Sequence, residues 1–463
     1  MLRISLIGLG TSVVPLDTAV NIAFPDITRN FGLPLQLIQW VVICYVLTYA
    51  SLMLGFGRAG DVWGHGRVFR FGLAWSVVAY LLCAAAPSYG WLLVCRFLQG
   101  VGAALIVSCA PALVTGLFSE DKRSRAVGAF SVIYAIGSAA GPLLGGLLVQ
   151  RWGWPAVFWF RAPLALLALL FLGGLPPVVP HTSPRQPLDV FGAVLLAIGI
   201  SAVLLMLNQL QHILLLVSLA MLAVISLAGF ILWENRVAQP IINLAVFRTG
   251  EFAVINVVSV LIYLTSFSVI LLGPYYLVRF TGSSTATAGA VLGMSFVGSI
   301  IASPIAGSII ERVPASRVAV LGALLCGAGL ALMGSWDPAA AWQPVAIMAA
   351  LALQGFGVGL FQVAYMDIVM RTLPRHHRGV AGSIAMLSRS LGVVTGATLL
   401  TLIFHTVEAF SLARGQTPSG GFLAGFNWTA RLAGVVCGLA GLLVLAVRSR
   451  RWGRVGGDDP ERG

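Results

Sequence analysis

The sequence Leu98-Gln-Gly-Val-Gly-Ala-Ala-Leu105 recurs later in the chain as Leu353-Gln-Gly-Phe-Gly-Val-Gly-Leu360, at an offset of 255 residues. A second set of residues recurs with identical spacing at an offset of 250: Gly57, Asp61, Arg67 and Gly72 in the first copy, and Gly307, Glu311, Arg317 and Gly322 in the second. The two matches keep the same order and nearly the same offset, so they indicate an internal repeat. We therefore predict two structurally similar halves.

The segments around both copies are strongly apolar. The 463 residues are 59% hydrophobic and only 9% charged, whereas about a quarter of the residues in a soluble domain are charged. So few charges cannot cover a water-facing surface of this length, and a membrane-spanning helix needs about 20 mostly apolar residues. We predict fourteen such spans, near residues 4–25, 38–57, 69–86, 90–117, 126–149, 155–175, 190–207, 212–232, 252–278, 286–310, 318–334, 343–370, 380–404 and 427–447.

The basic residues are distributed unevenly between the two ends of these spans. With the N-terminus in the cytoplasm, 20 Lys and Arg side chains fall on the inner side and 4 on the outer side, as the positive-inside rule requires. This bias predicts an even number of spans, both termini in the cytoplasm and a multi-pass protein of the cell membrane. It also explains the net charge of +13 without nucleic acid, because the sequence offers no soluble basic domain to bind it.

The repeat and the spans together predict an all-α integral membrane fold. The offset covers eight spans, so both copies have the same orientation across the membrane, as in many transporters. We predict a six-helix bundle over residues 1–178, a linker with two inserted transmembrane helices over 179–239, and a second six-helix bundle over 240–447. Residues 240–248 are too short to span and are expected to lie along the inner interface. Residues 448–463 form a basic cytoplasmic tail.

The sequence contains no motif for a catalytic, nucleotide-binding or metal site. The patterns G-x-x-x-x-G-K-[ST], G-x-S-x-G and H-E-x-x-H are absent, and no set of His and Cys residues has metal-ligand spacing. The six cysteines lie in apolar runs without a C-x-x-C pair, which is typical of small buried side chains. These features predict a protein that is not an enzyme and has no cofactor. A transporter is favoured, and a membrane receptor or sensor without flux is the alternative from another class.

Four motifs resemble the major facilitator superfamily, in particular its fourteen-helix drug:proton antiporters. They are Leu16-Asp-Thr-Ala-Val-Asn-Ile-Ala-Phe-Pro25 in the first helix, Gly57-Arg-Ala-Gly-Asp-Val-Trp-Gly-His-Gly-Arg67 in a loop, Arg96-Phe-Leu-Gln-Gly-Val-Gly102 in the fourth helix and Gly137-Ser-Ala-Ala-Gly-Pro-Leu-Leu-Gly-Gly146 in the fifth. The resemblance covers nearly the whole chain and implies two parallel six-helix bundles with two inserted helices. The fifth-helix motif is typical of exporters, so the resemblance implies efflux of small amphipathic compounds, such as drugs or antibiotics, in exchange for protons. A proton-coupled importer of a nutrient or an organic anion is the alternative.

The expected partners are a small-molecule substrate, protons and the lipid bilayer, with a monomer as the functional unit.

One motif departs from the family. Its sixth helix usually begins with Trp-Arg-Trp followed by Asn-x-Pro, whereas this chain has Trp152-Gly-Trp154 and then Phe160-Arg161-Ala-Pro163. The departure places a charge near the outer half of the expected cavity. Arg161 either attracts an anionic group of the substrate or extends to the outer headgroups.

Asp17 and Arg96 lie at similar depths in the first and fourth predicted spans. Asp17 is eight residues from the outer end of its span, about 12 Å deep, and Arg96 is about 9 Å deep. Charges at such depths are costly and point to a function. We therefore expect Asp17 to bind the coupling proton, and Arg96 to pair with it or to regulate its protonation. The alternatives are a structural acid and an arginine that extends to the headgroups. Asn21, one turn after Asp17, either contacts substrate or makes a packing hydrogen bond.

Charged residues at the inner ends of spans in both repeats are candidates for a gate. They are Asp61, Arg67, Glu311 and Arg317. Acids and bases at these places can bridge the two halves in one state and release them in the other. The alternative is a set of solvated loop charges, but the identical spacing in the two copies favours the gate.

Small residues in the fifth predicted span follow a four-residue period and therefore lie along one helix face. They are Gly137, Gly141, Pro142, Gly145 and Gly146. Such a face permits close helix packing, and the proline permits a kink, so this helix can act as a hinge between states. Arg389 lies nine residues inside the thirteenth span. We expect a structural role for it, in a pair with a carbonyl group or an acid.

Overall fold

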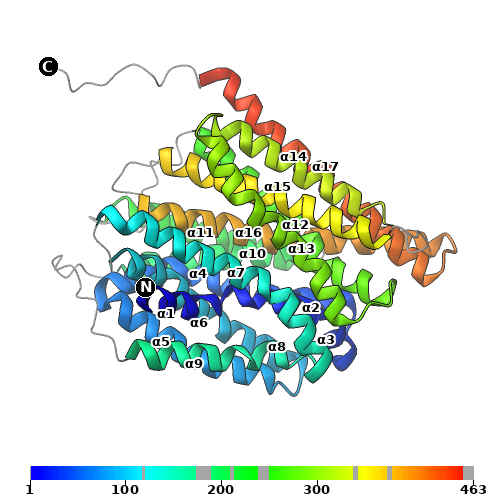
Figure 1. The fold of residues 1–463 in the computed structure, drawn as a ribbon, viewed down its shortest axis with the longest axis horizontal. Coiled ribbons are helices and arrows are strands. Elements are labelled where there is room, and N and C mark those ends of the chain that lie inside the picture. Colours follow the sequence, from blue (N-terminus) through cyan, green and yellow to red (C-terminus); the bar gives the residue numbers. More distant parts are fainter. Residues whose placement is uncertain are drawn as a thin grey trace.

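The structure is a computed structural model that describes residues 2–116, 120–173, 189–208, 213–237, 250–336, 343–372 and 378–451. All regular elements in these ranges are helices (Figure 1). The predicted interfacial segment 240–248 lies outside the described residues, and so does the predicted tail from residue 452 onward.

The first half of the chain forms one helical bundle, in blue to blue-green in Figure 1. Its elements are α1 (Leu2–Ser12), η1 (Pro15–Thr18), α2 (Ala19–Ile22), α3 (Phe24–Phe31), α4 (Leu35–Trp63), α5 (His65–Ala84), α6 (Tyr89–Gly116), α7 (Glu120–Trp152), α8 (Ala156–Trp159) and α9 (Arg161–Gly173). The elements α1 to α3 follow one another as a single bent segment, and α8 leads into α9. The bundle therefore contains six helical segments, as predicted.

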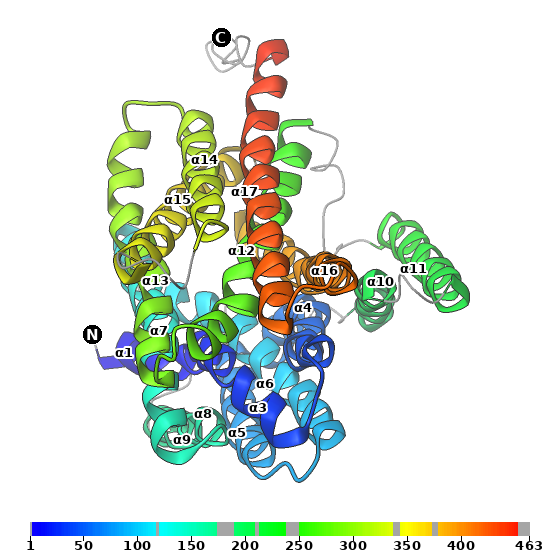
Figure 2. The ribbon, with the colours of Figure 1, turned by 90° about the vertical axis from the view of Figure 1, so that its right-hand side faces the viewer.

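The second half forms another bundle, and two helices lie beside both. The two inserted helices are α10 (Val190–Asn208) and α11 (Ile213–Glu234), and the second bundle consists of α12 (Gly250–Arg279), α13 (Thr285–Ile310), α14 (Ala315–Met333), α15 (Gln343–Thr372), α16 (Arg378–Ala413) and α17 (Pro418–Arg451). Figure 2 shows α10 and α11 at one side, where α10 contacts both α4 and α16. Helix α11 is peripheral, and exposed side chains such as Leu214 form a surface suited to lipid.

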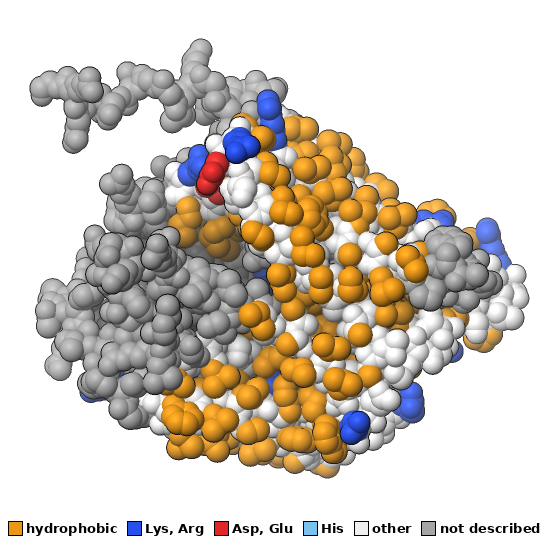
Figure 3. Space-filling view, in the orientation of Figure 1, with side chains coloured by type: hydrophobic (Ala, Val, Ile, Leu, Met, Phe, Trp, Pro, Cys, Tyr) orange, Lys and Arg blue, Asp and Glu red, His pale blue; other side chains and the backbone are white. Residues whose placement is uncertain are grey.

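The number of helices agrees with fourteen spans. Nine helices in the described part of the chain are long and apolar enough to cross a membrane, and the bent pair Leu6–Ile22 with Phe24–Phe31 adds a tenth. Three shorter apolar helices, at Leu37–Met53, Ala156–Leu172 and Val190–Val203, and α7 fill the remaining predicted positions in order. On the face drawn in Figure 3, hydrophobic side chains cover the middle, and Lys and Arg side chains lie towards the margins. This distribution is the one expected of a protein surrounded by lipid.

The internal repeat is visible as equivalent packing in the two bundles. In the first bundle α6 packs against both α4 and α5, and in the second bundle α15 packs against both α13 and α14. The repeated segments 98–105 and 353–360 lie in α6 and α15, respectively. The prediction of two similar halves in the same orientation is therefore confirmed.

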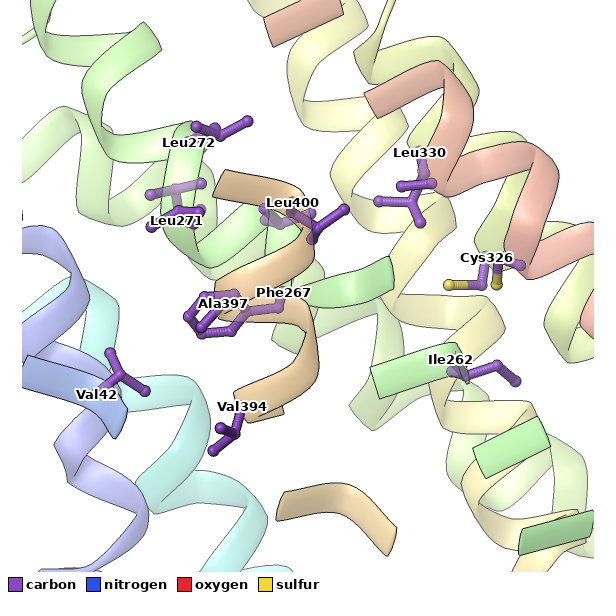
Figure 4. Close-up of a cluster of buried hydrophobic side chains, with 14 of the residues drawn as sticks. Val42, Ile262, Phe267, Leu271, Leu272, Cys326, Leu330, Val394, Ala397 and Leu400 are labelled. Carbon is purple, nitrogen blue, oxygen red and sulfur yellow. The ribbon is translucent and has the colours of Figure 1, made fainter. Parts of the chain in front are cut away.

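The two bundles share a hydrophobic core towards one end. We call this the outer end, because the charge distribution assigns the turns after α3, α5, α7 and α12 to the outside. One cluster of buried side chains includes residues of both bundles, such as Val42 in α4 and Val394 in α16 (Figure 4). A second cluster, with Ile7, Met53 and Leu113, contains residues of the first bundle alone. The bundles are thus packed together at the outer end, while the inner part of the first bundle has a core of its own.

Candidate functional site

Asp17 lies in a broken part of the first span, which the sequence predicts as one helix over residues 4–25. Pro15 starts the short 3-10 helix η1, because proline lacks the N–H that an α-helix needs at this place. A second break at Ala23, just before Pro25, bends the segment by 59°. The breaks place the Asp17 carboxylate against α6 and α9, with 14% of its side chain exposed.

Arg96 on α6 binds both oxygen atoms of the Asp17 carboxylate. Its Nη1 donates to Oδ1 at 2.7 Å, and its Nη2 donates to Oδ2 at 2.8 Å. The same guanidinium donates from Nε to the carbonyl oxygen of Val41 at 2.7 Å and from Nη1 to Oε1 of Gln99 at 2.8 Å. Only 1% of the Arg96 side chain is exposed, so it does not extend to the headgroups. This forked geometry fixes the orientation of the carboxylate.

Arg161, the first residue of α9, binds the same carboxylate from a different helix. Its Nη1 donates to Oδ1 of Asp17 at 2.7 Å, and its Nε donates to the carbonyl oxygen of Val157 at 3.1 Å. The Arg161 side chain is 0% exposed, so the alternative in which it extends to the headgroups is wrong. Its Nη2 is buried and has no hydrogen-bond partner among the described residues. Oδ1 also accepts from Nε2 of Gln99 at 2.8 Å.

We call Asp17, Arg96, Gln99 and Arg161 the carboxylate cluster, and it carries an excess of positive charge. Two guanidiniums and one carboxylate leave a net charge of +1, and neither arginine forms an ion pair with another described acid. Aromatic rings support the cations. The ring of Tyr45 lies 4.4 Å from Cζ of Arg96, and that of Tyr80 lies 4.5 Å from Cζ of Arg161. Cation–π attraction offsets about 0.5–2 kcal/mol per pair of the cost of burying these cations, but it does not neutralise their charge.

Gln99 is absent from the residues that the sequence singles out, although the repeat contains a signal for it. The glutamine at the equivalent position of the second half is Gln354. It accepts a hydrogen bond from the Ser295 hydroxyl at 2.6 Å and donates to the Ser266 hydroxyl at 3.2 Å. Leu351, which is buried, stands at the position of Arg96. Among the described residues, the charged form of this site therefore exists in the first half alone.

The glycine-rich face of α7 packs against the broken helix that carries Asp17. Three of the five predicted small residues form this contact: Gly137, Gly141 and Gly145. A Cβ atom on Gly145 would lie 2.8 Å from the Cα atom of Ala19, and one on Gly141 would overlap the hydroxyl of Thr18. Larger residues at these positions would push η1 and α2 away from α7. The glycines therefore help to fix the position of the carboxylate.

The other two small residues, Pro142 and Gly146, face the second bundle. A Cβ atom on Gly146 would overlap the carbonyl oxygen of Thr285 at the start of α13. In return, a Cβ atom on Gly289 of α13 would overlap the carbonyl oxygen of Pro142. The two helices are thus in backbone contact near the outer end, which small residues permit. Opening the outer end would separate them.

Gly289→Ala is expected to weaken the closed outer end, whereas Gly293→Ala, one turn later on α13, is expected to have little effect. The new methyl group at position 289 meets the backbone of α7, and such overpacking costs about 1–3 kcal/mol. A Cβ atom at position 293 has no neighbour within 4 Å. The measurement is the thermal unfolding midpoint of each purified variant in detergent. Equal midpoints for the two variants would contradict the close contact between α7 and α13.

The predicted gate residues lie in equivalent turns, but the structure does not bring them together. Arg67 is in the first turns of α5, Glu311 follows α13, and Arg317 is in α14; all three side chains are exposed. None of the three forms an ion pair with another described residue, and the side chain of Asp61 lies outside the described part. This arrangement agrees with inner ends that are apart, and the gating role stays a prediction.

Asn21 and Arg389 lie outside the hydrogen bonds of the carboxylate cluster. Asn21 is partly exposed in α2, one turn after Asp17. Arg389 in α16 has its Cζ 5.3 Å from the ring centroid of Tyr263, which is within the range of a cation–π contact. The roles expected for both residues stay predictions.

Comparison with known proteins places the chain among transporters. The model of the Major Facilitator Superfamily matches residues 6–250 and 255–461. The chain is 32% identical to the puromycin resistance protein pur8 of Streptomyces alboniger, over 88% of this chain and 82% of that protein. It is 30% identical to the tetracenomycin C resistance and export protein of Streptomyces glaucescens, over 86% and 74% of the two chains. It is also 27% identical to the riboflavin transporter RibZ of Clostridioides difficile (strain 630), over 93% and 94%.

Solved structures show the same architecture. A peptide transporter POT in complex with sulfate has a TM-score of 0.71 and 16% sequence identity, and the match covers 96% of this chain and 94% of that chain. A bacterial homologue of the human lysosomal transporter Spinster, in an inward-facing and unoccupied conformation, has a TM-score of 0.69 and 14% identity over 96% of both chains. At these identities the likeness shows a shared fold.

Proposed function

Because the chain belongs to the major facilitator superfamily, a family of multi-pass transporters rather than enzymes, we propose that it exports a small amphipathic organic compound in exchange for protons. The direction is supported by relatives named for puromycin resistance and for tetracenomycin C resistance and export. The exporter-type face of α7 supports it as well. The observation that carries the proposal is the carboxylate cluster, in which an intramembrane acid is held between two buried arginines.

In this proposal Asp17 binds and releases the coupling proton. Asp17, Arg96 and Arg161 are the three charged members of the cluster, and we call them the ionic triad. Asp17 is partly exposed, whereas Arg96 and Arg161 are almost fully buried. The ionised carboxylate accepts four hydrogen bonds from three side chains. A proton on Asp17 removes the charge that holds both guanidiniums and so loosens α6 and α9 from the broken first helix. Because α7 packs on that helix and also on α13, this change reaches the contact between the bundles.

The predicted gate acts at the opposite end of the bundle. Closing the inner end would bring the turn between α4 and α5 towards the turn between α13 and α14. The acids and bases repeated there, Asp61, Arg67, Glu311 and Arg317, would then be able to pair. Opening the outer end would separate α7 from α13. The proposal places a monomer in the cell membrane with both termini in the cytoplasm, and the distribution of basic residues supports this orientation of the termini.

Transport by purified protein in liposomes tests the proposal. Puromycin and riboflavin are the first compounds to measure, because two of the relatives are named for them. An acidic lumen is expected to drive uptake of substrate into the lumen, since protons leave as the substrate enters, and a protonophore is expected to abolish this uptake. A resistance profile of expressing cells with cationic, neutral and anionic compounds would identify further substrates. Ligand binding without gradient-driven flux would contradict the proposal and favour a receptor or sensor.

A proton-coupled importer of an organic anion is the second candidate, and the net charge of the cluster favours it. Two guanidiniums can accept a protonated Asp17 and an anion together, because the charge of the cluster then stays at +1, as in the empty site. Proton and substrate would therefore move in the same direction. Uptake that requires an alkaline lumen, and not an acidic one, would identify import.

A further inference from the structure

We infer that Arg161 binds an acidic group of the substrate, so that the transported compounds include carboxylates or related organic anions. The inference rests on the proposed function, because it names the substrate class of the same site. Arg161 stands where the sixth-helix pattern of the resembled family has asparagine. The second buried cation is therefore a feature that the family resemblance leaves unexplained.

The hydrogen bonds of Arg161 are incomplete in a way that those of Arg96 are not. All three nitrogen atoms of Arg96 have acceptors. In Arg161, Nε donates to a backbone carbonyl and Nη1 donates to Asp17, but the buried Nη2 has no partner among the described residues. A buried donor without an acceptor is costly, and the cost is larger for a charged group. An oxygen atom of a ligand would satisfy it.

The charge of the cluster selects among the ligands that could supply this oxygen atom. The other ion pairs between Arg and acidic side chains in the described residues, Asp26 with Arg29 and Asp367 with Arg371, do not involve the cluster. A neutral ligand would leave the net charge of +1 in place, and a cationic ligand would raise it. One anion would cancel it, and a carboxylate oxygen atom can accept a charge-assisted hydrogen bond from Nη2. An anionic group is therefore the ligand that completes both the hydrogen bonds and the charge.

The broken helix offers a route to the buried nitrogen. Asp17 is the exposed part of the ionic triad, so a ligand approaches from its side. The helical pieces η1 and α2 are four residues each and have few internal hydrogen bonds to lose. Because η1 carries Asp17, a shift of this segment also moves the carboxylate that Arg161 binds.

Binding to the purified full-length protein in detergent tests the inference, without any pH gradient. The probes are benzoate, 2-naphthoate and indole-3-acetate, each compared with the carboxamide of the same compound by isothermal titration. The wild-type protein is expected to prefer the carboxylates. Arg161→Asn is expected to weaken carboxylate binding by about tenfold to a hundredfold, the effect of a lost charge-assisted hydrogen bond, and to weaken carboxamide binding less, because a neutral oxygen atom makes a weaker hydrogen bond. Arg414→Asn, at an exposed arginine near the outer end of α16, is the control and is expected to change neither.

Three results would overturn the inference: no binding of any carboxylate, equal affinity for acids and amides, or equal weakening of both by Arg161→Asn. If the asparagine variant does not fold, Arg161→Lys replaces it. That variant keeps the charge but loses the fork, so the preference for acids is expected to shrink, whereas a purely structural arginine predicts no change in preference. Carboxylate binding without gradient-driven flux would refute the proposed function and leave only the assignment of Arg161 to an anionic ligand intact. Gradient-driven flux of neutral and cationic compounds alone would support the proposed function and overturn this inference.

Discussion

Asp17→Asn is expected to abolish pH-driven transport and to destabilise the protein strongly. The asparagine amide does not bind and release a proton at any pH used in a transport experiment, so transport is no longer coupled to the proton gradient. The same change removes the carboxylate that two buried guanidiniums share. Removing one partner of a buried ion pair costs about 3–5 kcal/mol. Flux into liposomes with an acidic lumen measures the first effect, and the thermal unfolding midpoint in detergent measures the second.

A double variant separates these two effects. In Asp17→Asn the two guanidiniums leave a charge of +2, and adding Arg161→Asn returns the cluster to +1, the charge of the native site. The double variant is expected to recover much of the lost stability and none of the pH-driven flux. If flux returns together with stability, Asp17 is a structural counter-ion and the coupling role assigned to it is wrong.

Arg96→Lys is expected to reduce transport by about tenfold or more, because each lost charge-assisted hydrogen bond is worth about 1.5–3 kcal/mol. The substitution keeps the charge. However, a single ammonium nitrogen cannot hold both oxygen atoms of Asp17 while it also reaches Val41 and Gln99, as the guanidinium does. Initial rates of gradient-driven uptake by equal amounts of protein measure the effect.

Arg431→Lys is the matched control for this substitution. Arg431 on α17 donates from Nε to the carbonyl oxygen of Gly334 at 2.9 Å, far along the chain from the carboxylate cluster and in the other bundle. The control is expected to transport at nearly the wild-type rate. If Arg96→Lys transports as well as the control does, the forked geometry is unnecessary and the pair acts through charge alone.

The helices and the two halves are predictable from the sequence, because burial in lipid depends mainly on the polarity of each residue in a segment and little on its tertiary contacts. Each crossing needs about 20 apolar residues, and basic residues mark the inner side. The helical segments accordingly follow the predicted order, and the repeated segments occupy equivalent helices. The breaks near Pro15 and Pro25 are not predictable in this way. The composition of a span does not reveal whether a proline inside it is absorbed by a kink or interrupts the helix.

The site was harder to predict than the fold. Depth along a helix places Asp17 and Arg96 at similar levels, and the cost of a charge in lipid marks both as candidates. Neither the depth nor the cost shows which way each side chain points. Arg161 is 144 residues from Asp17, and its depth is compatible with either the headgroups or the interior. Arg161 and Asp17 are brought together by the orientation of α9 and by the close packing of the α7 glycines against the broken helix.

The amino-acid sequence therefore specifies a fourteen-helix transporter with one intramembrane acid in its first helix, because apolar length and basic end residues are local properties. The folded chain adds that this acid is shared by two arginines, that a glutamine of the repeat completes the set, and that one guanidinium nitrogen has no hydrogen-bond partner in the described part of the chain. Net charge and unsatisfied donors depend on which side chains converge in space. Neighbours along the chain do not determine that convergence; the packing of α6, α7 and α9 around the broken first helix does.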